Sequence, residues 1–232
     1  MVGLAELRDR PLVYVDDLDR PLLAEADRHH FERVLRVRNG DPIVVGDGRG
    51  GWRPARFAAE PEPTGEGGRI PPALDVVTVA FAPVKGERAE WVAQKLTEIG
   101  VDRIAPVLSE RGVVRWNDER AKKQLARMET VAREACLQSR RLHLPMILPL
   151  TPLDTFLGEQ TGAVLADPEG TTIDAKHRTI VIGPEGGFSE AERRGRAAVA
   201  LPGNVLRATT AAIVAGAIVC GLRDDQIGAS PS

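Results

Sequence analysis

Apolar and polar positions along the chain form two regions with different periods. In the first region, an apolar run at 12–15 and two runs within the glycine-rich segment 42–57 predict strands. The pattern at 29–37 predicts a short helix that Asp27 caps. Residues 60–73 carry Pro, Gly and Glu without apolar periodicity, which is typical of a linker. The first region is therefore expected to be a small, mostly β domain.

In the second region the apolar runs alternate with helical patterns, which predicts a mainly parallel sheet covered by helices. The expected strands are 75–83, 103–108, 163–167, 179–183 and 204–207. The expected helices are 87–100, a long one that opens near Asn117 as its cap, and 209–222.

The first two of these helices are amphipathic. The helix at 87–100 carries Trp91, Val92, Leu96 and Ile99 on one face, and Gly100 is placed to end it in a left-handed turn. The long helix has an apolar stripe and basic residues that face elsewhere. The stripe is Leu125, Met128, Ala132 and Ala135, and the basic residues are Arg120, Lys123 and Arg127.

The helix at 209–222 is apolar nearly all round. A helix without a polar face must be buried on every side, by the sheet on one side and by other protein on the other. A second subunit would supply that cover and make a homodimer. The alternative is a central core helix of a monomer.

Composition excludes several classes of protein. No apolar stretch reaches the length of about 18 residues that a membrane span needs, and the N-terminus has charges where a signal peptide needs an apolar core, so a cytoplasmic protein is expected. Cys136 and Cys220 lie far apart in helical patterns and are expected to be buried free thiols. The four histidines fit no zinc spacing, so no metal is expected.

The formal net charge is −2, but charge is unevenly distributed. From Arg103 to Arg141 there are ten Lys or Arg against five Asp or Glu. This surplus can present a basic face to an anionic polymer, or it can be an ordinary solvated helix surface.

The segment VIGPEGGFSEAE, residues 181–192, predicts a strand, a tight turn and the start of a helix. Its three glycines leave the main chain open to a ligand. Ser189 and Glu192 have the spacing of a capping box, and Phe188 stands where a hydrophobic staple would. Such a turn at the carboxyl edge of a sheet is a usual place for a nucleotide-like ligand.

The chemistry of this turn argues against phosphate. It contains neither of the common phosphate-binding glycine motifs, and Glu185 would repel an anion. A cationic ligand such as S-adenosylmethionine (SAM) fits better, although a structural turn without a ligand is the alternative.

Four ordered segments, at 85–113, 132–145, 180–192 and 201–212, resemble the RsmE family of ribosomal RNA uridine methyltransferases in the SPOUT superfamily. The resemblance covers nearly the whole chain. It implies a PUA-like, RNA-binding domain at 1–72 and a SPOUT methyltransferase domain at 73–232.

In this family the C-terminal domain is α/β with a deep trefoil knot, an exception to the rule that chains avoid knots. SAM lies within the knot, and two subunits pair near the active site. The resemblance therefore implies methylation of N3 of a uridine in 16S ribosomal RNA, with the RNA or the small ribosomal subunit as partner. A non-catalytic ribosome-assembly protein of the same fold, or a SPOUT enzyme for another RNA position, are the alternatives.

The resemblance also implies which residues form the site. The cofactor loops correspond to Leu165, Ala166, Gly183, Pro184, Glu185, Gly186, Gly187, Leu201, Val205 and Leu206. The leucines and Val205 could instead be plain core residues. Thr209 is the eleventh cofactor candidate, but it stands where the family usually has Glu and offers only a neutral hydroxyl. The role of that Glu therefore does not carry over, and Glu185 is the remaining nearby anion.

Arg207 is the candidate catalytic residue, since the resemblance places it beside the cofactor. Arg111 is a candidate for binding the RNA substrate. Gln138 and Arg140, which are expected to follow the long basic helix, match a family motif near the substrate and are candidates too. Each could instead be an ordinary surface residue. The N-terminal domain would add phosphate contacts from its arginines, which are Arg33, Arg36, Arg38, Arg49 and Arg53.

Overall fold

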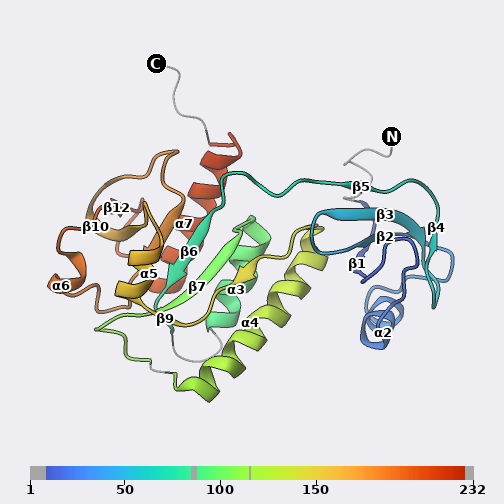
Figure 1. Ribbon diagram of the computed structural model, residues 1–232, viewed down its shortest axis with the longest axis horizontal. Coiled ribbons are helices and arrows are strands. Elements are labelled where there is room, and N and C mark those ends of the chain that lie inside the picture. The colour runs from blue at the N-terminus through green and yellow to red at the C-terminus, as the bar shows by residue number, and fades with distance from the viewer. Residues whose placement is uncertain (1–8, 85–87, 115, 228–232) are drawn as a thin grey trace. The chain divides into compact units, whose positions relative to one another are not determined.

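The computed structural model describes residues 9–84, 88–114 and 116–227 (Figure 1). Contacts divide the chain into two compact units. The first holds the described residues up to Ala73 together with Arg133–Leu144, and the second holds Leu74–Ala132 and the described residues from Pro145 onward. No pattern in the sequence predicted that residues 133–144 belong to the first unit.

The first unit is built on a small mixed sheet. Its elements are β1 (Leu12–Tyr14), α2 (Glu25–Arg33), β2 (Pro42–Gly46), β3 (Gly51–Arg56), β4 (Glu62–Pro63) and β5 (Gly68–Arg69). β1 pairs parallel with β2, and β2 pairs antiparallel with β3 across the predicted glycine-rich turn. β4 and β5 both pair with β3, so the predicted linker is partly wrong: it supplies two short edge strands.

Two predictions about side chains in this unit have opposite outcomes. Asp27 does not cap α2, because the helix begins at Glu25 and Asp27 lies in its first turn. Its carboxylate instead accepts two hydrogen bonds from the Arg133 guanidinium, at 3.0 and 2.7 Å. Cys136 is confirmed as a buried free thiol, as is Cys220 in the second unit, and burial raises the pKa of the Cys136 thiol.

The second unit contains the predicted parallel sheet, which confirms the α/β architecture. Its strands are β6 (Thr78–Phe81), β7 (Arg103–Leu108), β8 (Met146–Ile147), β9 (Thr151–Pro152), β10 (Val164–Thr172), β11 (Thr179–Ile182) and β12 (Ala198–Ala200). Its helices are α3 (Arg88–Ile99), α5 (Leu153–Glu159), α6 (Glu190–Arg193), α7 (Ala208–Arg223) and the first part of α4 (Asp118–Ser139). The order across the described sheet is β12-β10-β11-β6-β7-β8, with β9 beside β7, and every pair is parallel. The trefoil knot stays a prediction.

Alternation along the strands sorts the core into two layers, one on each face of the sheet. On one face Val79 and Ile180 pack in a cluster with residues of α3, α4 and α7. On the other face Ala80 and Val181 pack with residues of α5 and with Phe188. Helices therefore cover both faces, as Figure 1 shows.

The predicted end of α3 and the predicted start of α4 are confirmed. Gly100 has a φ of 106° and its amide donates to the last turn of α3. The Asn117 side chain caps α4 by accepting from the Arg120 amide at 2.9 Å. Trp91, however, is 45% exposed, so its predicted place on the buried face of α3 is wrong.

The strand predicted at 204–207 is wrong, because this segment is a loop. The last strand is β12, where Val199 is fully buried. Gly203 turns the chain with a φ of 99°, and Val205 is 94% exposed, which no strand inside this sheet would allow. The loop 201–207 is thus free to form the wall of a pocket.

Candidate functional site

The glycine turn lies directly after β11, at the carboxyl edge of the sheet. Gly187 has a φ of 68°, and its amide closes the turn on the Pro184 carbonyl at 2.8 Å. A Cβ at Gly183 would lie 3.1 Å from the Phe188 ring. Both positions therefore favour glycine, Gly187 because of its positive φ and Gly183 because an added methyl group would crowd the Phe188 ring.

The helix signal after the turn is confirmed. The Ser189 hydroxyl accepts from the Glu192 amide at 3.1 Å, and the Glu192 carboxylate accepts from the Ser189 amide at 2.8 Å. This reciprocal capping box fixes the start of α6. Phe188 is buried next to it, as a staple residue would be.

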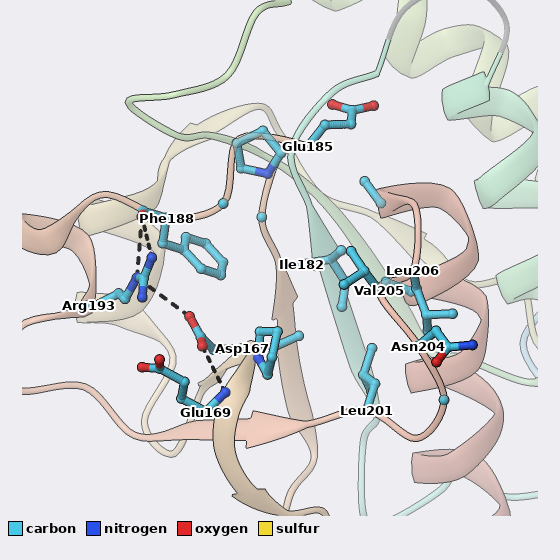
Figure 2. A pocket seen from close by; sticks show the side chains of 18 residues that line it. Asp167, Glu169, Ile182, Glu185, Phe188, Arg193, Leu201, Asn204, Val205 and Leu206 are labelled. Carbon is cyan, nitrogen blue, oxygen red and sulfur yellow. Dashed lines mark hydrogen bonds and ion pairs between the residues drawn. The ribbon is translucent and has the colours of Figure 1, made fainter.

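A pocket of about 670 Å³ opens between the glycine turn, the loop 201–206, the first turn of α7 and the middle of β10 (Figure 2). Its apolar lining includes Ile182, Leu201, Val205 and Leu206. Its volume falls in the range of small-molecule and cofactor sites. These segments are far apart in the sequence, and the sheet brings them together because β10 pairs with both β11 and β12.

Carboxylates give the pocket its electrostatic character. Asp167, Glu169 and Glu185 all line it, against a single lining guanidinium, that of Arg193. Arg193 lies 3.5 Å from the Asp167 carboxylate and also donates to the Phe188 carbonyl, as Figure 2 shows. The lining therefore favours a ligand with positive charge over a polyphosphate.

Eight of the eleven predicted cofactor residues line this pocket. They are Ala166, Gly183, Pro184, Glu185, Gly187, Leu201, Val205 and Leu206. Leu165 does not, because its side chain is buried in the core on the α5 face. Gly186 and Thr209 are also absent from the lining.

Leu165 and Ala166 lie inside β10, in agreement with the strand expected at 163–167. The register of β10 against β12 shifts between Ala166 and Thr171, which marks a bulge. The bulge turns Asp167 and Glu169 toward the pocket.

Several lining residues were missed. They are Asp167, Pro168, Glu169, Ile182, Phe188, Arg193, Gly203, Asn204, Ala208 and Ala211. Asp167 to Glu169 directly follow the residues that were predicted, so a Pro between two acids near the end of an apolar run was the available signal. Ala208 and Ala211 gave none, because small residues on an apolar helix fit core packing equally well.

Arg207 lies between two lining residues, Leu206 and Ala208, and is the N-cap residue of α7. Its side chain is exposed, and its carbonyl accepts from the Ala211 amide at 2.8 Å. The backbone at this position is thus fixed, while the guanidinium is free to turn toward a ligand at the mouth.

Arg111 lies against the glycine turn. Its Nη1 donates to the Gly186 carbonyl at 3.2 Å. The structure therefore brings Arg111 to the turn that walls the pocket.

The other predicted substrate residues belong to the first unit. Arg33, Arg36 and Gln138 are exposed, and Gln138 lies inside α4 and not after it. Arg140 is half-buried, and its Nη1 donates to the Leu137 carbonyl at 2.6 Å. Burial lowers the pKa of this guanidinium.

The other three arginines predicted to bind phosphate in the first unit differ in whether their side chains are already paired. Arg38 and Arg49 are exposed, whereas Arg53 pairs with Asp19 and donates to the Gly65 carbonyl. Arg53 is therefore less available to a phosphate than the sequence analysis expected.

Within the described ranges, no three His, Cys, Asp or Glu side chains are grouped so that they could hold a metal ion. In the same ranges, none of the helices has both the length and the apolar character for a membrane crossing.

Comparison with family models defines the class. A model described as an RNA methyltransferase domain matches residues 71–220, and one described as an RNA methyltransferase PUA domain matches residues 23–63. The first match alone spans more than half of the chain, so this is an RNA methyltransferase of that class.

Individual relatives narrow the class. The chain is 35% identical to the ribosomal RNA small subunit methyltransferase E of Mycobacterium tuberculosis, over an alignment that covers 88% of either chain. It is 27% identical to that of Bacillus subtilis, over 71% of this chain and 73% of the relative. The chain belongs to this small subunit methyltransferase E family, RsmE.

A solved structure agrees with this assignment. The ribosomal RNA small subunit methyltransferase E from Neisseria gonorrhoeae, bound to S-adenosyl methionine, superposes with a TM-score of 0.75 at 28% identity. The match covers 92% of this chain and 98% of that one.

Proposed function

We propose that this protein transfers a methyl group from SAM to N3 of a uridine in 16S ribosomal RNA. The observation that carries the proposal is the acid-lined pocket between the glycine turn, the β10 bulge and the loop 201–206, in a chain of the RsmE family. Its partner is the ribosomal RNA or the small ribosomal subunit, and its expected location is the cytoplasm.

The residues of the pocket fit SAM. SAM carries a sulfonium and an ammonium group, and Asp167, Glu169 and Glu185 supply negative charge in the lining. The glycine turn exposes main-chain groups for the ribose and adenine edges, and Leu201 and Leu206 offer apolar contact. When bound, SAM supplies an electrophilic methyl group.

Arg207 has the role of electrostatic stabiliser in this proposal. Uridine N3 first gives up its imino proton to solvent, and the resulting negative charge spreads onto the carbonyl oxygens of the base. N3 then bonds to the methyl carbon as the bond between that carbon and the sulfonium sulfur breaks, and the neutral thioether S-adenosylhomocysteine leaves. A guanidinium aimed at those oxygens lowers the barrier by about 3 kcal/mol in a water-poor site. Holding the two reactants in line supplies much of the remaining acceleration.

The RNA would be held by sequence-independent phosphate contacts from both units. The candidates are Arg33, Arg36, Gln138 and Arg140 in the first unit and Arg111 in the second. Because each phosphate contact releases counterions, RNA affinity should fall as salt rises.

The homodimer belongs to the same proposal. α7 buries Ala212, Ala215 and Val219 in the core, but Thr210 and Ala217 on its other side are exposed in the described chain. A second copy would cover this face, as an apolar helix requires.

The reaction is tested by mapping modified nucleosides by mass in 16S RNA from a strain that lacks this protein. A missing N3-methyluridine that returns with the wild-type protein supports the proposal. A different missing nucleoside points to another RNA position. Unchanged RNA, with no SAM binding by calorimetric titration, points to a non-catalytic assembly protein.

Leu206→Ala tests whether the apolar wall binds the cofactor or only packs the core. Leu206 is half-buried, lines the pocket and packs against the hydrophobic cluster between the sheet and α3, α4 and α7. We expect calorimetry to show SAM affinity reduced by about tenfold, since a half-buried leucine side chain contributes about 1–1.5 kcal/mol of apolar contact.

The matched control is Leu222→Ala, a half-buried leucine of α7 that does not line the pocket. It should lower the unfolding free energy and leave SAM affinity unchanged. Equal SAM affinities for Leu206→Ala and the wild type would leave core packing as the role of this leucine.

A further inference from the structure

The glycine turn has two sides with different neighbours. Gly183, Glu185 and Gly187 line the pocket, whereas Gly186 does not. A Cβ at Gly186 would lie 3.7 Å from the Arg111 Cβ, in ordinary contact. The loop after β7, which carries Arg111, therefore packs on the back of the same turn whose front walls the pocket.

A single buried carboxylate holds this loop and the turn together. Glu192 is 3% exposed, although it lies in a helix of only four residues. One of its oxygens accepts from the Ser189 amide at 2.8 Å, within the capping box. The other accepts from the Glu110 amide, also at 2.8 Å, across 82 positions of sequence.

The hydrogen bond from the Glu110 amide to Glu192 is not part of the capping box. A capping box requires one acceptor at this position, and a glutamine serves as well as a glutamate. A carboxylate differs because both of its oxygens only accept. Glu192 uses that property to reach the residue immediately before Arg111.

We propose that Glu192 is a positioning residue for Arg111. It holds the loop after β7 against the glycine turn, so that the Arg111 guanidinium stays beside the methyl-donor pocket to contact the RNA. Arg111 is exposed, and among the described residues its side chain makes one hydrogen bond, to the Gly186 carbonyl. Its other donors are free to meet a phosphate or base carbonyl oxygen.

This inference rests on the proposed methyltransferase function, because it assigns a role within that reaction. It explains why a buried charge is kept in so short a helix. The carboxylate joins two loops that serve the two substrates.

Glu192→Gln separates the two bonds. The side-chain oxygen of glutamine can still accept from the Ser189 amide and keep the capping box. Its NH₂ group then faces the Glu110 amide, a donor against a donor, and the loop that carries Arg111 is released.

We expect kcat/KM for the 16S RNA substrate to fall about tenfold, which corresponds to about 1.4 kcal/mol. The Kd for SAM, measured by calorimetry without RNA, should change less than about twofold, since the front of the turn keeps its cap. Glu190→Gln is the matched control, because Glu190 is an exposed acid in the same helix and its loss changes the charge equally. It should behave as the wild type in both measurements.

A double-mutant cycle links the effect to Arg111. In an Arg111→Ala background, Glu192→Gln should lower kcat/KM by less than about twofold, because the residue it positions is gone. Additive losses would overturn the proposal, and so would a Glu192→Gln protein that keeps full kcat/KM. A Glu192→Gln protein that cannot fold or bind SAM would overturn it as well, since Glu192 would then support the fold or the pocket as a whole. Failure of the proposed function is distinct, because the wild type itself would then neither bind SAM nor methylate RNA.

Discussion

Arg207→Ala is expected to lower kcat for methyl transfer to 16S RNA by about a hundredfold, the effect of removing one well-placed stabiliser of developing negative charge. The Kd for SAM should stay within about twofold of the wild-type value, because Arg207 is exposed and is not part of the pocket lining. Single-turnover transfer of a labelled methyl group at saturating RNA and SAM measures the first quantity, and calorimetry measures the second.

Two further variants make the Arg207 result specific. Arg207→Lys keeps the positive charge but not the planar fork of donors, so it should recover only part of the lost rate. Arg194→Ala removes an exposed arginine at the end of α6 that does not line the pocket, and it should leave kcat unchanged. Full methyl transfer by Arg207→Ala would rule out the electrostatic role.

The parts of the site that were predictable from the sequence are local. A capping box involves residues three positions apart, so Ser189 and Glu192 could be read directly from their spacing. The same holds for Asn117 at the start of α4 and for Gly100 at the end of α3. In each case the backbone within one helical turn determines the interaction, and tertiary contacts are not required.

The sequence-based predictions were wrong or incomplete where pairing with another strand determines the conformation of a segment. Residues 204–207 have the composition of a strand, but β10 pairs with Ala198–Ala200 instead, and Gly203 redirects the chain. Asp167 and Glu169, which line the pocket, lie in the segment where the register of β10 against β12 shifts. A bulge depends on the register of two strands, which a single strand's sequence does not contain.

The link between Glu192 and the Glu110 amide illustrates the same limit over a longer distance. The capping box predicted that the carboxylate would face the Ser189 amide, and it gave no information on the second oxygen. Its partner follows β7, two strands away from β11 across the sheet. The family resemblance named the pocket loops, but only the fold shows how the loop of Arg111 is joined to them.

Gly170→Ala is expected to be strongly destabilising, at a position next to the pocket-lining residue Glu169. A Cβ at Gly170 would lie 2.4 Å from the Val199 amide nitrogen and 2.5 Å from the Ala198 carbonyl carbon, both backbone atoms of β12. Backbone in a paired strand cannot move aside without breaking the β10–β12 ladder. We expect the unfolding free energy in urea to fall by about 3 kcal/mol, at the upper end for overpacking.

The substitution should also displace residues that line the cofactor pocket, because Asp167 and Glu169 lie in the same bulge as Gly170. SAM affinity should therefore fall together with stability. Gly158→Ala is the matched control: Gly158 lies in α5, where an added Cβ meets no atom within 4 Å. That change should leave SAM affinity intact and stabilise the protein by about 0.5–1 kcal/mol, as alanine does in helices. Gly170→Ala with wild-type stability would mean that β12 does not hold the position described beside Gly170.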